Sequence, residues 1–260
     1  MTNTNVLTIQ QRDKFAGTGV LRLDDFYPAA DIATMRCRLW GDLERRYILG
    51  RDQPQTWSVA MPAGFGPLRR SGAFAAVGSP ELRAVADALF GLSCWAEPDA
   101  WGLPLVTFPT AAPVLPRPPW HLDIGGLERL SPLPALKVFT FLDEVEPGGG
   151  GTLYVAGSHL LALDLERRNG TPVRSAEVRD GLKTHSWFAD LLATPSADLA
   201  AMVGAGAQIG AHPVRLEEMS GAPGDLIIMH PAVLHGTAHN ARSRPRMMLM
   251  ETLKRRNPAA

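Results

Sequence analysis

The chain has 260 residues, 45% of them hydrophobic, and its 26 basic and 26 acidic side chains leave a formal net charge of zero. This balance gives no reason to expect a nucleic-acid partner, and no apolar run approaches the roughly 20 residues that a membrane-spanning helix needs. The first residues also lack the basic start and apolar core of a secretory signal, so we expect a cytoplasmic protein.

Two helices are predicted in the first hundred residues. The first begins at Asp31, which is placed to cap it, and the second begins at Ser79 and ends before Gly91. In both helices the apolar residues recur at the 3.6-residue spacing of a buried helical face. These residues are Ile32, Met35, Leu39 and Leu43 in the first helix and Leu82, Val85 and Leu89 in the second.

Beyond about residue 101 the chain changes to short β-type runs separated by turns rich in glycine and proline. Strands are predicted over residues 136–142, 152–155, 213–218, 226–229 and 246–253. The four glycines at 148–151 predict a hairpin between the first two of these strands, and the turn at 220–225 predicts a second hairpin. The stretch from about 160 to 205 is partly helical and is a candidate lid.

Many short strands with flanking helices are typical of a mainly β protein, and we expect a jelly roll, the double-stranded β-helix of cupin-like proteins. The mouth of such a small barrel is a place where inward-facing side chains can gather a metal ion. No linker, repeat or low-complexity segment marks a boundary, so we expect one domain over residues 1–260. Its helical and mixed part covers about 1–100 and its jelly-roll core about 101–255.

His121 and Asp123 are the strongest candidates for metal binding. If they lie on a strand, their side chains share one face, because residues i and i+2 of a strand point the same way. His235, 112 residues after Asp123, completes a set of two nitrogens and one oxygen. This set is the facial triad of non-haem Fe(II) oxygenases, which leaves coordination positions open for an oxo acid and dioxygen.

Other histidines are weaker alternatives for the third ligand. His230 and His239 flank His235, and the four-residue spacing of His239 would place it on the same strand face. His159 follows a Gly-Ser turn and is expected to be structural. His185 and His212 have no companions and are expected on the surface or in loops.

A fixed cation for a carboxylate cosubstrate is expected close to the metal. Arg246 stands eleven residues after His235, at the start of the last predicted strand. Its planar guanidinium suits bidentate pairing with a carboxylate. Arg242 and Arg244 are alternatives on the same face, and Lys137 is either a second cation or a surface lysine that extends into solvent.

Three segments together resemble the phytanoyl-CoA dioxygenase (PhyH) family of Fe(II)/2-oxoglutarate-dependent oxygenases. They are WHLDIGG at 120–126, GGGGTLYVAGSHL at 148–160 and GDLIIMHPAVLHGTAHNARSRPR at 224–246. The opening around DKFAGTGVLRLDDFYPAADI is similar too, so the resemblance spans most of the chain.

The resemblance implies an enzyme with Fe(II), 2-oxoglutarate as cosubstrate and O2, releasing succinate and CO2. Carried over from the family, His121, Asp123 and His235 bind iron, Arg246 binds the far carboxylate of 2-oxoglutarate, and Thr237 contacts the same carboxylate. Family halogenases lack the carboxylate ligand, so Asp123 predicts hydroxylation or a related oxidation and not halogenation. Two alternatives stay open: a cupin-like metalloprotein that does not use 2-oxoglutarate, and a non-catalytic jelly roll that binds a small molecule.

The expected substrate is a small molecule, such as a secondary-metabolite intermediate, because no dense basic patch for the phosphates of coenzyme A is evident. Six side chains are candidates to line its pocket, although core packing is the commoner role of such residues. They are Trp57, Met61, Phe65, Trp120, Trp187 and Phe188. The oligomeric state is not predicted.

Overall fold

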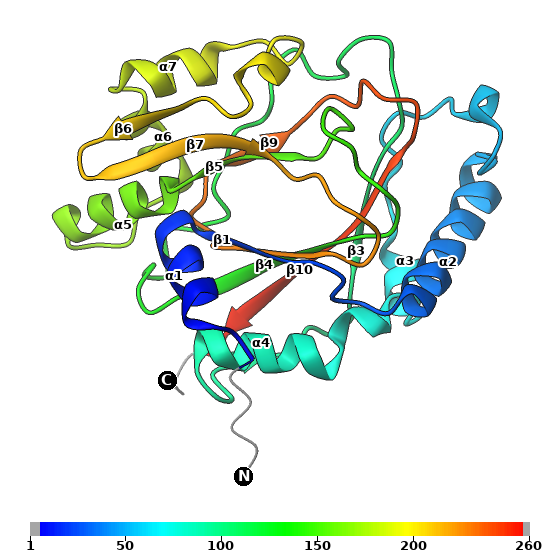
Figure 1. Cartoon of the computed structure of the whole chain (residues 1–260), viewed down its shortest axis with the longest axis horizontal. Helices are drawn as coiled ribbons and strands as arrows, with labels where there is room; N and C mark the ends of the chain where they lie inside the picture. The colour runs from blue at the N-terminus through cyan, green and yellow to red at the C-terminus, as the bar shows by residue number, and fades with distance from the viewer. Residues whose placement is uncertain (1–5, 257–260) are drawn as a thin grey trace.

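The computed structural model describes residues 6–256, whose strands form two sheets that face each other (Figure 1). One sheet has six strands in the order β1-β8-β4-β10-β2, with β3 also pairing with β10, and the other has four in the order β6-β7-β5-β9. The first contains β1 (Val20–Leu23), β2 (Trp95–Ala96), β3 (Leu103–Thr107), β4 (Ala135–Phe141), β8 (Leu226–Met229) and β10 (Arg246–Arg255). The second contains β5 (Thr152–Ala156), β6 (Gly206–Ile209), β7 (His212–Glu218) and β9 (His235–Thr237).

This arrangement is the predicted jelly-roll architecture, mainly β with flanking helices. The described strands remain two separate sheets and do not close into a continuous barrel. Every strand pairing in them is antiparallel.

The two predicted hairpins are wrong. β4 and β5 lie in different sheets, and so do β7 and β8. The turns at 148–151 and 220–225 therefore carry the chain from one sheet to the other, as the alternating strand order of a jelly roll requires. Local sequence marks a turn but does not say whether the next strand returns to its neighbour or crosses to the facing sheet.

Helices cover the outer faces of both sheets (Figure 1). The α-helices are α1 (Ile9–Thr18), α2 (Ala29–Tyr47), α3 (Gly66–Arg70), α4 (Pro80–Phe90), α5 (Ser158–Asn169), α6 (Ser175–Leu182) and α7 (Ser186–Ala193). Short 3-10 helices lie at Pro54–Thr56, Ala75–Gly78 and Leu199–Met202. No helix in the described part of the chain is long and apolar enough to span a membrane.

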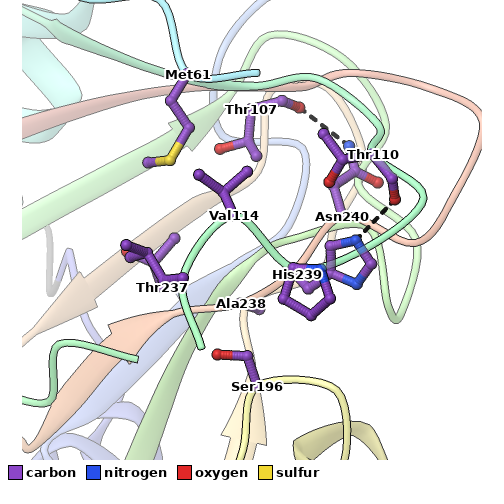
Figure 2. Close-up of a pocket in the computed structure, with 11 residues that line it drawn as sticks. Met61, Thr107, Thr110, Val114, Ser196, Thr237, Ala238, His239 and Asn240 are labelled. Carbon is purple, nitrogen blue, oxygen red and sulfur yellow. Dashed lines mark hydrogen bonds between the residues drawn. The ribbon is translucent and has the colours of Figure 1, made fainter. Parts of the chain in front are cut away.

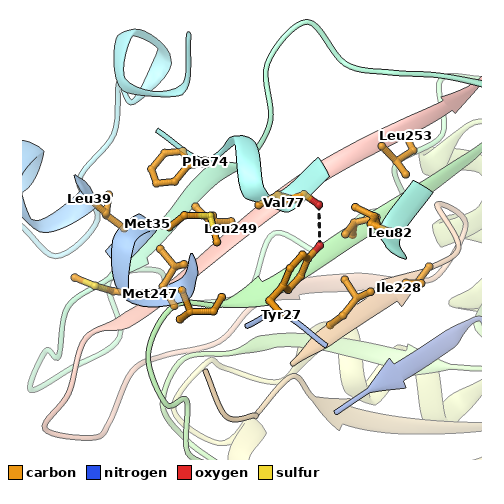
Figure 3. Close-up of a cluster of buried hydrophobic side chains, with 14 of the residues drawn as sticks. Tyr27, Met35, Leu39, Phe74, Val77, Leu82, Ile228, Met247, Leu249 and Leu253 are labelled. Carbon is orange, nitrogen blue, oxygen red and sulfur yellow. Dashed lines mark hydrogen bonds between the residues drawn. The ribbon is translucent and has the colours of Figure 1, made fainter. Parts of the chain in front are cut away.

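α2 and α4 pack on the six-stranded sheet through the apolar faces that their sequences predict. Figure 3 shows Met35 and Leu39 of α2 and Leu82 of α4 packed with Leu249 of β10 in one buried cluster. α4 begins as predicted, since the Ser79 hydroxyl accepts a hydrogen bond from the Leu82 N–H at 3.2 Å. α2 begins earlier than predicted, after Pro28, and Asp31 lies in its first turn without capping it.

Most of the segment from 160 to 205 is an outer layer of the fold, and its last part remains a candidate lid. α5, α6 and α7 bury their apolar side chains against the four-stranded sheet, with Phe188 and Leu191 completely buried beside Val155. The end of the segment, from Ser196 to Val203, borders cavities that Thr237 of β9 also lines.

A third apolar cluster fills the space between the sheets. Phe139 and Phe141 of β4 meet Met248 of β10 there, whereas Leu136 and Val138 of β4 face the helices. Because side chains alternate along a strand, Lys137 shares the inner face with Phe139, and Arg246 and Thr252 share it with Met248. The inner faces of the two sheets therefore carry a few polar side chains among apolar ones.

Candidate metal centre

The structure brings His121, Asp123 and His235 together. One ligand atom from each lies within 4.8 Å of the other two. His121 and His235 exchange two backbone hydrogen bonds, of 2.9 and 3.0 Å, and the Asp123 N–H donates to the carbonyl of Pro231 at 2.9 Å. The HxD segment thus lies alongside β9, although it forms an isolated bridge rather than the regular strand that we expected.

Both imidazoles are oriented for metal binding through Nε2. The Nδ1 of His121 lies 2.7 Å from the carbonyl of Pro119, and the Nδ1 of His235 lies 3.0 Å from that of Val233. A carbonyl can only accept, so each Nδ1 carries the proton and each Nε2 keeps its lone pair, the arrangement typical of metal-binding histidines. The Nε2 atoms lie 3.8 Å (His121) and 3.4 Å (His235) from the Asp123 carboxylate.

The protonation states also suit a divalent cation. Burial and the neighbouring His235 lower the pKa of His121, which favours the neutral imidazole. Burial alone would raise the pKa of Asp123, but its contacts with His235 and Lys137 outweigh burial and hold that pKa well below its usual range. Two imidazoles and one carboxylate, with 46% of the His121 side chain open to solvent, fit an iron ion with open coordination positions.

Lys137 is not a surface lysine. Its side chain is 9% exposed, and its Nζ lies 3.1 Å from Oδ2 of Asp123 and donates to the Thr252 hydroxyl at 2.9 Å. Of the two alternatives for Lys137, the structure supports the second cation near the site and contradicts the lysine that extends into solvent. This cation contacts the proposed metal ligand, which the sequence could not show because β4 and the HxD segment belong to different layers.

Arg246 differs from the other two candidate arginines in being buried. It is 4% exposed, and its Nη1 donates to the carbonyl of Gly150 at 2.8 Å. The Arg244 side chain is 64% exposed beside Glu144, and the Nε of Arg242 donates to the carbonyl of Pro147 at 2.7 Å.

The buried guanidinium of Arg246 has unused capacity for a carboxylate. Its Nε is buried without a hydrogen-bond partner among the described residues, and the Glu218 carboxylate, although close enough to raise the pKa of Arg246, forms no ion pair with it. Burial lowers the pKa of Arg246 to about 10, so the side chain stays charged at neutral pH. A buried cation that lacks a direct ion pair is costly, and an anionic cosubstrate would provide that partner.

Thr237 lies two residues beyond His235 on β9 and lines a small cavity (Figure 2). Thr107 of β3 and Met61 line the same cavity, whose volume of about 20 Å³ admits roughly one water-sized group. Thr107 is a site residue that sequence reasoning missed. A lone threonine in a proline-rich run carries no motif, and only its strand pairing reveals its surroundings.

The remaining histidines lie outside the triad. His230 and His159 are buried with ring centroids 5.1 Å apart, and the Nε2 of His159 lies 3.1 Å from the carbonyl of Ala16. The Nε2 of His239 lies 2.8 Å from the carbonyl of Thr110. His212 contacts the Asp164 carboxylate at 2.7 Å, and exposed His185 precedes α7.

Of the six candidate pocket residues, Met61 lines a cavity and the aromatic side chains pack in cores. Trp57 and Phe65 pack with the cluster under α2, and Trp120 and Phe188 are buried in the cluster under α5–α7, where Trp187 also packs. Core packing, the commoner role for such side chains, is therefore what the structure shows for these aromatic residues.

Comparisons with known proteins agree with the family resemblance of the sequence. A family model described as Phytanoyl-CoA dioxygenase (PhyH) matches residues 15–248. A comparison with curated protein sequences finds no significant match.

Three solved structures illustrate the likeness in fold. AviO1 from Streptomyces viridochromogenes Tue57 has a TM-score of 0.58 at 16% identity, over 99% of this chain and 98% of that one. EctD from S. alaskensis with 2-oxoglutarate and 5-hydroxyectoine has 0.59 at 17%, over 98% and 78%. HygX from Streptomyces hygroscopicus with nickel and 2-oxoglutarate bound has 0.54 at 16%, over 96% and 87%.

Proposed function

Because the chain belongs to the phytanoyl-CoA dioxygenase (PhyH) family, whose members are Fe(II)/2-oxoglutarate-dependent oxygenases, we propose that it hydroxylates a C–H bond of a small molecule. The observation that carries the proposal is the cluster of His121, Asp123 and His235, with both Nδ1 atoms tied to backbone carbonyls. These three side chains would hold Fe(II) and leave three coordination positions open.

The cosubstrate would lie between this centre and Arg246. The guanidinium of Arg246 would pair with the far carboxylate of 2-oxoglutarate, and Thr237, two residues after His235 on the same strand face, would donate its hydroxyl to that carboxylate. Iron held by these residues, together with 2-oxoglutarate and O2, would supply the oxidising power, with succinate and CO2 as the products of 2-oxoglutarate. The side chains of the protein fix the geometry and keep the carboxylate end dry.

Asp123 supports hydroxylation or a related oxidation of the substrate. A carboxylate that occupies a metal position leaves no place for the chloride that the family's halogenases bind there. Its acidic character in this structure, with a pKa well below the usual range because of His235 and Lys137 despite burial, keeps it available as a ligand. The substrate we propose is a free small molecule such as a biosynthetic intermediate; the EctD structure, which is similar in fold, holds the small molecule 5-hydroxyectoine together with 2-oxoglutarate.

The test is anaerobic addition of Fe(II) and 2-oxoglutarate to the metal-free protein. We expect the weak visible charge-transfer band of an iron-bound 2-oxo acid, and we expect His235→Ala to lose it. His212→Ala, which changes a histidine bound to Asp164 outside the triad, is the matched control and should keep it. A folded, iron-loaded protein without the band would favour the cupin-like or non-catalytic alternatives.

A further inference from the structure

Thr107 is the direct strand partner of Arg246. In the register of β3 and β10, Arg246 lies opposite Thr107 and Met248 lies opposite Leu105. Residues directly opposite each other in an antiparallel pair have side chains on the same face, with Cβ atoms about 5 Å apart. Leu105 and Met248 belong to the cluster between the sheets, so the side chains of Thr107 and Arg246 also point into that space.

Both side chains keep a polar atom without a partner. Thr107 is 4% exposed, and its hydroxyl is buried with no hydrogen-bond partner among the described residues, as is the Nε of Arg246. Most buried hydroxyls are hydrogen-bonded, and an unsatisfied one costs about 1–3 kcal/mol. These two unsatisfied donors lie on paired residues that face the same space between the sheets, so a single acceptor group there would satisfy both.

Thr237 supplies a third donor from the facing sheet. It lines the same small cavity as Thr107, although the two residues belong to different sheets. In Figure 2 the Thr107 side chain points away from Asn240, toward the side on which Met61 and Thr237 lie. Asn240 is not available to this cavity as a donor, because its Nδ2 already donates to the carbonyls of Thr107 and Arg244.

We infer that Thr107 is a third anchor for the far carboxylate of 2-oxoglutarate, beside Arg246 and Thr237. This inference rests on the proposed function and refines its cosubstrate site. A carboxylate offers about four acceptor positions, so it can take hydrogen bonds from a guanidinium and two hydroxyls at once. The Thr107 hydroxyl thereby makes the site selective for a 2-oxo acid with a second carboxylate.

Thr140 is a matched control within the same sheet. It is 1% exposed, and its hydroxyl is also buried without a partner among the described residues. Thr140 alternates with Phe139 and Phe141 on β4, so its side chain points to the helix-covered face and away from the cosubstrate. Thr140→Val and Thr107→Val thus remove the same group from equally dry surroundings on opposite faces.

The experiment measures binding under anaerobic conditions to the Fe(II)-loaded protein. The charge-transfer band is titrated with 2-oxoglutarate and with 2-oxobutyrate, which has the same oxo-acid head and no second carboxylate. Because a hydrogen bond to a charged group contributes about 1.5–3 kcal/mol, we expect Thr107→Val to weaken 2-oxoglutarate binding by about tenfold to a hundredfold. Binding of 2-oxobutyrate should not change, Thr107→Ser should restore 2-oxoglutarate binding, and Thr140→Val should match the wild type.

Two results would overturn the inference. One is unchanged 2-oxoglutarate affinity in Thr107→Val, and the other is an equal loss for both oxo acids, which would indicate a general distortion. If the valine variant does not fold, Thr107→Ala takes its place with the same comparison. A wild-type protein that binds iron but gives no band with either acid would contradict the proposed function itself, which separates the two failures.

Discussion

The Nζ of Lys137 lies 3.1 Å from Oδ2 of Asp123, so the carboxylate of the proposed metal triad already has a cationic partner. The same ammonium donates to the Thr252 hydroxyl at 2.9 Å, which fixes its position on the inner face of β4. A divalent metal ion on Asp123 would lie a few ångströms from this ammonium. A metal ion held by Asp123 would therefore share this carboxylate with Lys137, and the two cations would repel each other.

Lys137→Met is expected to respond differently with and without metal. Removing one partner of a buried ion pair costs about 3–5 kcal/mol, but Asp123 is 29% exposed, so we expect the metal-free variant to lose only about 1–2 kcal/mol. Because the repulsion is also removed, Ni(II) should stabilise the variant more than the wild type in urea unfolding. Lys254→Met, at an exposed position of β10, is the control, and an equal Ni(II) effect in all three proteins would contradict the prediction.

Arg246→Gln should separate cosubstrate binding from folding. Loss of the guanidinium removes charge-assisted hydrogen bonds to the far carboxylate, so we expect 2-oxoglutarate affinity to fall by at least about a hundredfold. Stability should fall by less than about 2 kcal/mol, because the change loses the hydrogen bond to the Gly150 carbonyl but also removes a buried charge that has no direct ion pair. Arg244→Gln, on an exposed side chain, should leave the affinity unchanged, and the anaerobic titration compares the two. A normal affinity in Arg246→Gln would place the anchor elsewhere.

The sequence predicts the parts of the site that depend on local spacing. Two residues share a face when they are two apart, and this rule places His121 beside Asp123 without any knowledge of the fold. The order of the three family-like segments along the chain then identifies His235 as the third ligand and Arg246 as the carboxylate anchor. The helix starting at Ser79 is equally local, since a serine followed by proline and an apolar period marks a helix start.

Local spacing along the sequence does not predict contacts between residues of the two facing sheets. From the sequence, Lys137 could be an exposed lysine on a strand. In the structure its ammonium contacts Asp123, which lies next to the facing sheet. Thr107 stands in a run broken by prolines, and its pairing with Arg246 joins residues 139 positions apart. The same limit explains the two wrong hairpins, because a turn sequence does not specify which sheet the following strand joins.

The buried pair of His159 and His230 predicts loss of stability in acid. Burial lowers the pKa of His159 to about 4 and that of His230 to about 3, against an ordinary value near 6.5. Both rings are thus neutral in the folded protein at pH 6, whereas the unfolded chain takes up protons below pH 6.5. Their contribution to stability is complete above pH 6.5 and is lost progressively as the pH falls toward these lowered values.

Urea unfolding of the metal-free protein between pH 7.5 and 5 measures this loss. Each neutral histidine adds up to about 1.4 kcal/mol of destabilisation for each pH unit below 6.5. His230→Gln should flatten the pH dependence, and His185→Gln, at an exposed position, should leave it as in the wild type. An identical slope in the His230 variant would assign the acid sensitivity to other groups.

Gly151→Ala should damage the cosubstrate site through the backbone. A Cβ at Gly151 would lie 2.0 Å from the carbonyl oxygen of Met219, which belongs to the main chain and cannot rotate away. The preceding carbonyl, of Gly150, accepts the hydrogen bond from Arg246, so a shift of this turn also displaces the guanidinium. We expect a loss of at least about 2 kcal/mol in stability and weaker 2-oxoglutarate binding in the folded fraction.

Gly41→Ala, in α2 with no atom within 4 Å of the new Cβ, should instead be slightly stabilising and keep normal binding, because alanine is the better helix former. If Gly151→Ala were as stable as the wild type with weakened binding, the turn would act on Arg246 alone; normal binding in both variants would mean that the Gly150 carbonyl does not position the anchor.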